Sequence, residues 1–316
     1  MMAPSSSLLV ILGATASGKS AVAMEMARET GAEILSVDSM QVYRGMDLGT
    51  AKPTAAERAA VRHHLIDVVD PNEPFTVARF VELADATIAQ AAATGRPLIA
   101  TGGTPLYYKA LFEGLFDGPP ADVAIRERLR AMSLDDLHAR LTTVDPVAAT
   151  RIHRNDDRRA IRALEVYELT GRSISSFQTD WSSPDQRHAA VWVGLTWERE
   201  ALNRRINARV KQMIEAGWVD ETRELLRQYG ELSPTAAEAT GYAELIAHLQ
   251  GKLSLDDAVE QIKIATRQLA KRQLKWIRRF PNVTWIDGDQ AMDALVAQVK
   301  ARWRSGPSPG TPGEAR

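Results

Sequence analysis

The chain has 316 residues and a formal net charge of −1, and 45% of its residues are hydrophobic and 25% are charged. These values are typical of a globular protein with one large domain or two smaller ones. The absence of cysteine excludes disulfides, thiolate metal sites and cysteine nucleophiles. No apolar stretch approaches the roughly 20 residues of a membrane-spanning helix, and the first residues lack the basic segment of a signal peptide. We therefore expect a cytoplasmic protein with no membrane association.

The first third of the sequence alternates between short apolar runs and longer amphipathic stretches. The first run ends at Gly13, which is typical of a buried parallel strand that leads into a tight turn. Strands that alternate with helices indicate an α/β fold with a parallel sheet. The expected elements here are strands at residues 7–12, 33–37, 65–69 and 97–101 and helices at residues 19–30 and 76–93.

Strand patterns disappear between residues 122 and 171, where several short helical segments follow one another. A strand expected at residues 191–195 and a long helix at 198–216 then return the chain to the core. The sequence thus predicts an α/β parallel-sheet core with a helical insertion domain. The expected division is a first core part at residues 1–120, the insertion at 121–187, a second core part with a basic C-terminal helix at 188–304, and a disordered tail rich in Gly, Pro and Ser at 305–316.

The eight residues after the first expected strand fit the pattern G-x-x-x-x-G-K-[ST] at every position. In such a phosphate-binding loop (P-loop), backbone N–H groups curl around phosphate oxygens, and the N-terminus of the next helix adds a favourable dipole. Lys19 supplies positive charge and the hydroxyl of Ser20 suits Mg²⁺. The alternative is a strand–turn–helix that contains these residue types by chance. The expected diphosphate- or nucleotide-binding residues are Gly13, Ala14, Thr15, Ala16, Ser17, Gly18, Lys19 and Ser20.

This loop predicts a phosphorylated ligand but not what happens to that ligand. A P-loop serves a nucleoside kinase or an ATPase, and it equally serves an enzyme for which a diphosphate is the leaving group. The run Leu65–Asp67 is compatible with a short Walker-B-like strand end, which keeps a P-loop kinase among the alternatives.

Several longer blocks of the sequence narrow this choice. Residues 36–53 read SVDSMQVYRGMDLGTAKP, residues 63–67 read HHLID, residues 102–107 read GGTPLY and residues 270–276 read AKRQLKW. Together with GATASGKS at residues 13–20, these blocks resemble the tRNA dimethylallyltransferase (tRNA isopentenyltransferase) family. The blocks stand in the family's order and reach to about residue 280, so the resemblance covers nearly the whole chain.

The resemblance implies transfer of a dimethylallyl group from dimethylallyl diphosphate to the N6 amine of the adenosine immediately 3′ of the anticodon in tRNA, with release of diphosphate. It also implies Mg²⁺ as a cofactor, binding of the tRNA anticodon stem-loop, and a monomer with no obligate protein partner. The P-loop would then hold the diphosphate, and Ser20 would ligate the metal ion.

The resemblance further implies three catalytic residues. Asp38 follows an expected strand, at the edge where open α/β sheets place their sites, and would accept a proton or hydrogen bond from the adenine amine. Thr104 would position the diphosphate or the base, and Arg205 matches the family's arginine near the diphosphate, with Arg209 one turn later. The alternatives are a turn cap for Asp38, a helix N-cap for Thr104 and a solvated basic face for Arg205.

The tRNA contacts implied by the resemblance fall in four places: the segment that begins at Asp38, the helical insertion, a later loop and the basic C-terminal helix. Exposed basic helix faces without a nucleic-acid partner are the alternative. After Gly241 and Tyr242 this chain has Ala243, where the family usually carries a basic residue. The expected tRNA-binding residues are Asp38, Ser39, Met40, Gln41, Arg158, Arg159, Arg162, Gly241, Tyr242, Lys271, Arg272, Gln273, Lys275, Trp276 and Arg278.

Two alternatives to this function remain besides the kinase. An isopentenyltransferase that acts on free adenine nucleotides has the same chemistry, but it does not need the helical insertion or the basic C-terminal helix. A non-catalytic RNA-binding protein does not need Lys19, Ser20 and Asp38 together.

Overall fold

In the computed structural model, the described residues are 8–114, 118–178 and 187–306. The chain divides into two compact units: a core unit of Met1–Leu111 with His188–Arg316, and a helical unit of Phe112–Arg187. The insertion expected at residues 121–187 falls within this helical unit. The tail expected at residues 305–316 lies outside the described residues from residue 307 onward.

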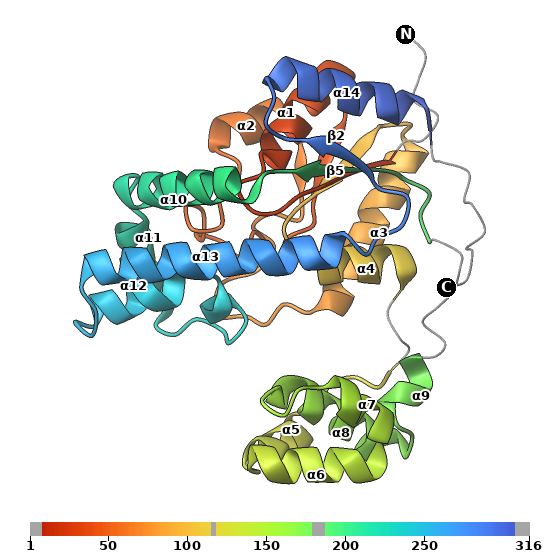
Figure 1. The fold of residues 1–316 in the computed structure, drawn as a ribbon, viewed down its shortest axis with the longest axis vertical. Coiled ribbons are helices and arrows are strands. Elements are labelled where there is room, and N and C mark those ends of the chain that lie inside the picture. Colours follow the sequence, from red (N-terminus) through yellow and green to blue (C-terminus); the bar gives the residue numbers. More distant parts are fainter. Residues whose placement is uncertain (1–7, 115–117, 179–186, 307–316) are drawn as a thin grey trace. The chain divides into compact units, whose positions relative to one another are not determined.

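The described residues of the core unit form one sheet of six parallel strands (Figure 1). The strands are β1 (Leu8–Leu12), β2 (Glu33–Ser36), β3 (His63–His64), β4 (Leu98–Thr101), β5 (Val191–Thr196) and β6 (Thr284–Asp287). Their order is β3-β2-β4-β1-β5-β6, so β1 lies inside the sheet between β4 and β5. All of β1 is buried, which is why its sequence is a continuous apolar run. The predicted α/β class with a parallel sheet is confirmed.

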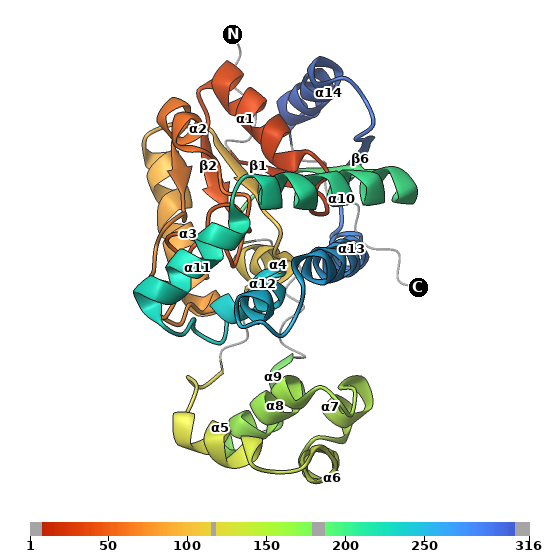
Figure 2. The same cartoon turned by 90° about the vertical axis from the view of Figure 1, so that its left-hand side faces the viewer.

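Helices cover both faces of this sheet. Figures 1 and 2 show α1 and α14 on one face and α4 and α13 on the other. On the first face, Leu9 and Ile11 of β1 belong to one buried cluster with Met26 and Trp303. With both faces covered, the loops at the carboxyl edge of the strands are the natural place for a site. These helices are α1 (Lys19–Thr30), α4 (Pro105–Glu113), α13 (Leu255–Ile277) and α14 (Met292–Arg304).

Two strand predictions differ from the structure. The strand expected at residues 65–69 is wrong: β3 consists of His63–His64 alone. Leu65 has φ 61° and Asp67 has φ 55°, and this left-handed conformation ends an extended strand. Strand β6 was not predicted, because this short edge strand consists mostly of half-buried or exposed residues and therefore gives a weak apolar pattern.

The other helices of the core unit lie between these elements or around the carboxyl edge. Thr76 caps α3 and Glu198 caps α10, because their side chains accept backbone N–H groups of the first turn. Within the described ranges, none of the helices combines the length and the hydropathy that crossing a membrane requires. These helices are α2 (Ala55–Ala60), α3 (Val77–Ala93), α10 (Arg199–Glu215), α11 (Trp218–Tyr229), the 3₁₀ helix η2 (Ala236–Glu238) and α12 (Tyr242–Leu249).

The helical unit has its own hydrophobic core and contains no strand among its described residues. Leu129, Leu137, Leu141 and Leu164 are almost completely buried and come from three different helices. A separate core is the property expected of a unit that folds around itself. Its helices are α5 (Val123–Arg130), α6 (Leu134–Val144), α7 (Pro146–Arg151), α8 (Asp157–Thr170) and α9 (Ile174–Gln178).

A buried carboxylate, that of Glu165 on α8, joins the helices of this unit. Its side chain is fully buried and accepts Nε and Nη2 of Arg126 at 2.8 and 3.0 Å, Nη1 of Arg162 at 2.5 Å and the backbone N–H of Asp122 at 2.8 Å. Burial alone raises the pKa of Glu165, and the hydrogen bonds from the two arginines outweigh it, so that the pKa lies below its ordinary value. Glu165 thus ties α5 and the segment before it to α8.

We expect Glu165→Ala to destabilise the helical unit by about 3 kcal/mol or more, because it leaves two arginines without their buried partner. Hydrogen exchange should show lost protection of α5 and α8, with the sheet amides unchanged. Glu127→Ala, which removes an exposed carboxylate of α5, is the matched control. Protection equal to the wild type in Glu165→Ala would contradict this role.

Candidate active site

A cavity of about 740 Å³ opens in the core unit at the carboxyl edge of the sheet. Three loops that follow neighbouring strands line it: the P-loop after β1, residues 38–41 after β2 and residues 102–104 after β4. They converge because the carboxyl ends of neighbouring parallel strands lie at one edge. Helices α10 and α13 contribute further lining residues, among them Arg205, Arg209 and Gln273.

The P-loop is tightly curled. A Cβ atom at Gly13 would lie 2.3 Å from Oγ of Ser17, so a larger residue at this position would displace the Ser17 side chain. Gly18, directly before α1, has φ 88°, and Ala16 has φ 64°. The left-handed conformation of Ala16 costs free energy in a residue with a Cβ atom, so neighbouring contacts must hold it.

Three side chains from distant parts of the sequence supply those contacts. Nε of Arg205 donates to the carbonyl of Ala16 at 2.9 Å, and Nε1 of Trp197 donates to the carbonyl of Ser17 at 2.9 Å. The Arg205 guanidinium also lies 4.3 Å from the centre of the Trp197 ring. From α13, Oε1 of Gln273 accepts the N–H of Thr15 at 2.8 Å. The predicted diphosphate arginine therefore contacts the P-loop directly.

Positive charge is concentrated beside this loop. Lys19 is buried, and burial, with a smaller contribution from Arg209, lowers its pKa to about 8, although Asp38 acts in the opposite direction. Burial also lowers the pKa of Arg209, and Arg205 adds to this effect. Burial and a like-charged neighbour thus disfavour the charged forms of Lys19 and Arg209, and a bound anion would stabilise these charged forms.

Asp38 lines the same cavity, and its charge acts on Lys19 and Arg209. Oδ1 accepts the N–H groups of Met40 and Gln41 at 2.9 and 3.4 Å, and Oδ2 accepts the N–H of Gly103 at 3.1 Å. The turn-cap alternative is therefore realised, and it fixes the carboxylate at a cavity-lining position instead of removing it from the site. These bonds tie the loop after β2 to the loop after β4.

Thr104 makes a second connection between the same two loops. Its Oγ1 accepts the N–H of Ser39 at 2.9 Å and donates to Oγ of Ser39 at 3.1 Å. The hydroxyl lines the cavity. Thr104 thus positions the segment that carries Asp38.

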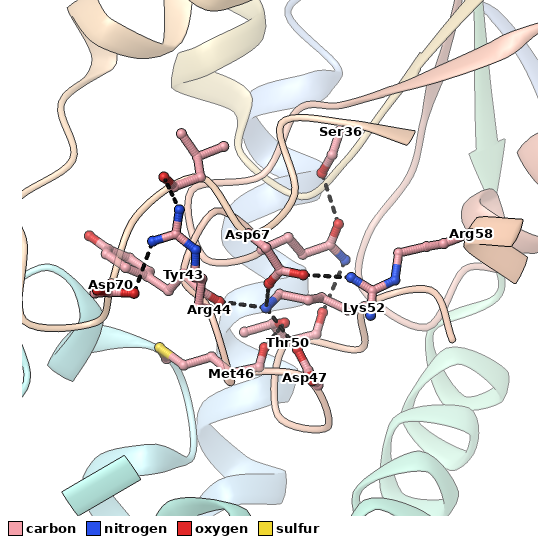
Figure 3. Close-up of polar contacts among 12 residues, drawn as sticks. Ser36, Tyr43, Arg44, Met46, Asp47, Thr50, Lys52, Arg58, Asp67 and Asp70 are labelled. Carbon is pink, nitrogen blue, oxygen red and sulfur yellow. Dashed lines mark hydrogen bonds and ion pairs between the residues drawn. The ribbon is translucent and has the colours of Figure 1, made fainter. Parts of the chain in front are cut away.

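The segment after Asp38 is held by its own polar side chains (Figure 3). The Gln41 side chain accepts from Oγ of Ser36 at 2.8 Å and donates to the carbonyls of Thr50 and Ala51, each at 3.2 Å. The ammonium group of Lys52 is buried and donates to the carbonyl of Tyr43 and to the carboxylates of Asp47 and Asp67 (Figure 3). This segment is therefore an ordered wall of the cavity.

Asp67, the acidic residue of the Walker-B-like run, takes part in this network. Its carboxylate binds Lys52 at 2.6 Å and Arg58 at 2.5 Å (Figure 3). Asp67 is not among the cavity-lining residues. A Walker-B carboxylate serves the metal ion at the phosphates. The position of Asp67 therefore argues against a P-loop kinase and favours the other functions considered from the sequence.

A further connection, which the sequence analysis missed, runs through Glu221 of α11. Its carboxylate accepts the successive backbone N–H groups of residues 47, 48 and 49 at 3.0, 2.6 and 3.3 Å, and the hydroxyl of Tyr242 at 2.6 Å. Tyr242 is fully buried, and a Cβ at Gly241 would lie 2.1 Å from the ring of Trp218. Glu221 and Trp197 gave no local signal because the backbone groups that they bind lie far away along the chain.

Comparison with known proteins identifies the family. The family model "IPP transferase" matches residues 41–280, and "Isopentenyl transferase" matches residues 6–73. A tRNA dimethylallyltransferase of Geobacter metallireducens is 46% identical over 296 residues, which covers 92% of this chain and 96% of that protein. The tRNA isopentenylpyrophosphate transferase of Bacillus halodurans is 39% identical, with a TM-score of 0.70 over 94% of this chain and 97% of that one.

The chain belongs to the tRNA dimethylallyltransferase (IPP transferase) family. The resemblance found in the sequence is thereby confirmed. A structure of a eukaryotic dimethylallyltransferase acting on tRNA, 28% identical, also superposes with a TM-score of 0.80 over 95% of this chain and 80% of that one.

In this tRNA dimethylallyltransferase family member, the predicted tRNA contacts have different degrees of exposure. On α13 and just after it, Lys271, Arg272, Lys275 and Arg278 are exposed, Trp276 is half-buried and Gln273 is buried. In the helical unit, Arg158 and Arg159 are exposed, whereas Arg162 is half-buried on Glu165 and the carbonyl of Pro119. Both units therefore carry exposed cations. The side chains of Gln273, Tyr242 and Arg162 instead form hydrogen bonds with other residues of the protein.

We expect the affinity for inorganic pyrophosphate to depend on the protonation of Lys19. Because the pKa of Lys19 is lowered to about 8, its amine is charged below that pH and loses its proton as the pH rises. Between about pH 7 and about pH 9, affinity measured by calorimetry should fall more steeply for the wild type than for Lys19→Met. The variant corrects for titration of pyrophosphate itself, and equal slopes for both proteins would contradict the assignment.

Proposed function

We propose that the protein transfers a dimethylallyl group from dimethylallyl diphosphate to the N6 amine of the adenosine immediately 3′ of the anticodon in tRNA, and releases diphosphate. The observation that carries this proposal is that one cavity is lined both by the P-loop, which suits an anion, and by Asp38. Its volume of about 740 Å³ suits a small ligand together with an everted base. Family membership supports the same activity.

The P-loop side accounts for the leaving group. When the bond between the allylic carbon and the diphosphate oxygen breaks, its electron pair remains on the diphosphate. Lys19, Arg205 and the backbone N–H groups at the start of α1 are placed to stabilise this negative charge. Protonated Lys19 contributes most when the anion is present, because the anion offsets the burial and the neighbouring Arg209 that lower its pKa.

Mg²⁺ fits this side of the cavity. The hydroxyl of Ser20 is a hard oxygen ligand at the first turn of α1, and Ser20 is exposed and lines the cavity. Among the described residues no group of three or more His, Asp and Glu side chains forms a metal site, so we propose that diphosphate oxygens supply the other ligands. When bound, the ion supplies further neutralisation of the diphosphate charge.

The Asp38 side accounts for the nucleophile. The lone pair of an adenine amine is delocalised into the ring, so the amine needs an acceptor for its proton as its nitrogen forms the bond to the allylic carbon. Asp38 is the carboxylate held between Met40, Gln41 and Gly103 at the cavity. The amine nitrogen bonds to the allylic carbon, the bond from that carbon to the diphosphate oxygen breaks, and the proton of the amine passes to Asp38.

The same features weigh against the alternatives. A kinase would require a Walker-B carboxylate at the phosphates, whereas Asp67 is bound to Lys52 and Arg58. A free adenine nucleotide would not require exposed cations on α13 and a separate helical unit. We further propose that the enzyme acts as a cytoplasmic monomer, since its own residues supply both sides of the cavity.

We expect labelled dimethylallyl diphosphate with Mg²⁺ to label unmodified tRNA, and not AMP or ATP offered separately. Asp38→Asn should lower the transfer rate by about a hundredfold to about ten-thousandfold, because proton transfer contributes this range. Asp293→Asn, an exposed change on α14, is the control. Label on AMP or ATP would support the free-nucleotide enzyme, and an unchanged rate in Asp38→Asn would remove the proposed base.

We also expect the helical unit to be required for tRNA and not for diphosphate. The N–H of Arg187 donates to the carbonyl of Phe112 at 2.9 Å, so a short linker can replace residues 113–186 without displacing the ends. Filter binding should show loss of affinity for an anticodon stem-loop, while calorimetry shows retained pyrophosphate binding. Full RNA affinity in this deletion, or loss of both ligands in a folded core, would contradict this division of roles.

A further inference from the structure

Gln273 differs from its neighbours on α13. Lys271, Arg272 and Lys275 are exposed, whereas Gln273 is buried and lines the cavity. A side chain in this position does not present itself to a phosphate backbone at the surface. Its amide therefore has a different role from the surrounding cations, and its hydrogen bonds indicate which one.

The two ends of the Gln273 amide bind two different loops of the site. Oε1 accepts the N–H of Thr15 in the P-loop at 2.8 Å, and Nε2 donates to the carbonyl of Gly103, after β4, at 2.6 Å. The N–H of Gly103 in turn donates to Oδ2 of Asp38 at 3.1 Å. A continuous series of hydrogen bonds thus runs from the P-loop through Gln273 and Gly103 to the Asp38 carboxylate.

This connection has little free space. A Cβ atom at Gly103 would lie 2.9 Å from Oδ2 of Asp38 and 2.9 Å from Nε2 of Gln273. Both polar groups therefore approach the same backbone position from different elements, one from the loop after β2 and the other from α13. Glycine at position 103 permits this approach, and any shift of Gln273 is transmitted to the groups beside it.

We infer that Gln273 is a positioning residue of the transfer reaction, which sets the P-loop and Asp38 at the separation that the reaction needs. This inference rests on the proposed function. Transfer requires the allylic carbon, held through its diphosphate on the P-loop, to meet an amine held at Asp38. Rates of such reactions depend steeply on how closely the two reactants are aligned. Gln273 touches neither reacting atom and acts through Thr15 and Gly103.

The test compares Gln273→Met, which keeps side-chain length but cannot hydrogen-bond, with Gln261→Met, an exposed change on the same helix. The single-turnover rate is measured with dimethylallyl diphosphate and unmodified tRNA at saturation, and the Kd values for an anticodon stem-loop and for pyrophosphate are measured separately. We expect Gln273→Met to lower the rate by about a hundredfold. The Kd for the stem-loop should stay near that of the wild type. The Kd for pyrophosphate should rise by much less than the rate falls, because Arg205 and Trp197 still hold the P-loop. Gln261→Met should match the wild type throughout.

A second variant examines the same connection from its other side. Gly103→Ala should lower the rate by itself, and the double variant Gln273→Met/Gly103→Ala should lose much less than the product of the two single effects, because both interrupt one connection. A side chain that only stabilises the fold would show independent effects and a changed thermal midpoint without this coupling.

The outcomes separate the inference from the function on which it rests. A Gln273→Met rate equal to the wild type would overturn the positioning role alone. A raised Kd for the stem-loop with an unchanged rate would also overturn it and would make Gln273 a tRNA contact. Absence of transfer by the wild-type protein to tRNA would overturn the proposed function and this inference with it.

Discussion

The hydrogen bond from Arg205 to the carbonyl of Ala16 is the interaction on which the site depends. Ala16 has a left-handed conformation that is unfavourable for a residue with a Cβ atom, and Arg205 holds it while resting on the ring of Trp197. Trp197 and Gln273 bind the residues on either side, Ser17 and Thr15. The curled backbone is therefore kept ready before any phosphate arrives, and the same contact brings a guanidinium to the edge of the cavity.

This arrangement concentrates positive charge at the cavity, which indicates that the ligand is an anion. The charge of Arg209 acts on Lys19, that of Arg205 acts on Arg209, and the Asp38 carboxylate acts on Lys19 and Arg209 in the opposite direction. Burial lowers the pKa of both Lys19 and Arg209. A multiply charged anion raises the pKa of Lys19 again and offsets the cost of burying these groups. Asp38, in contrast, is oriented by backbone N–H groups from two loops, which hold it at a cavity-lining position.

Patterns among neighbouring residues predicted the features that depend on neighbouring residues. The P-loop, α1 and the parallel sheet followed from glycine spacing and apolar runs. The strand expected at residues 65–69 failed because left-handed residues end β3, a feature of backbone conformation that apolar content does not reveal. The inward orientation of Gln273 and the capping of residues 47–49 by Glu221 join positions far apart in the sequence, so no pattern of neighbours predicts them.

The most direct test of the account is a crystal structure of the protein with Mg²⁺, a non-reactive analogue of dimethylallyl diphosphate and an unmodified anticodon stem-loop. The account predicts the diphosphate on the P-loop amides and Lys19, and the N6 amine of one everted adenosine within hydrogen-bonding distance of Asp38. A diphosphate bound away from the P-loop would contradict the central claim that one cavity unites leaving group and nucleophile. An adenosine held with its amine directed away from Asp38 would contradict it equally.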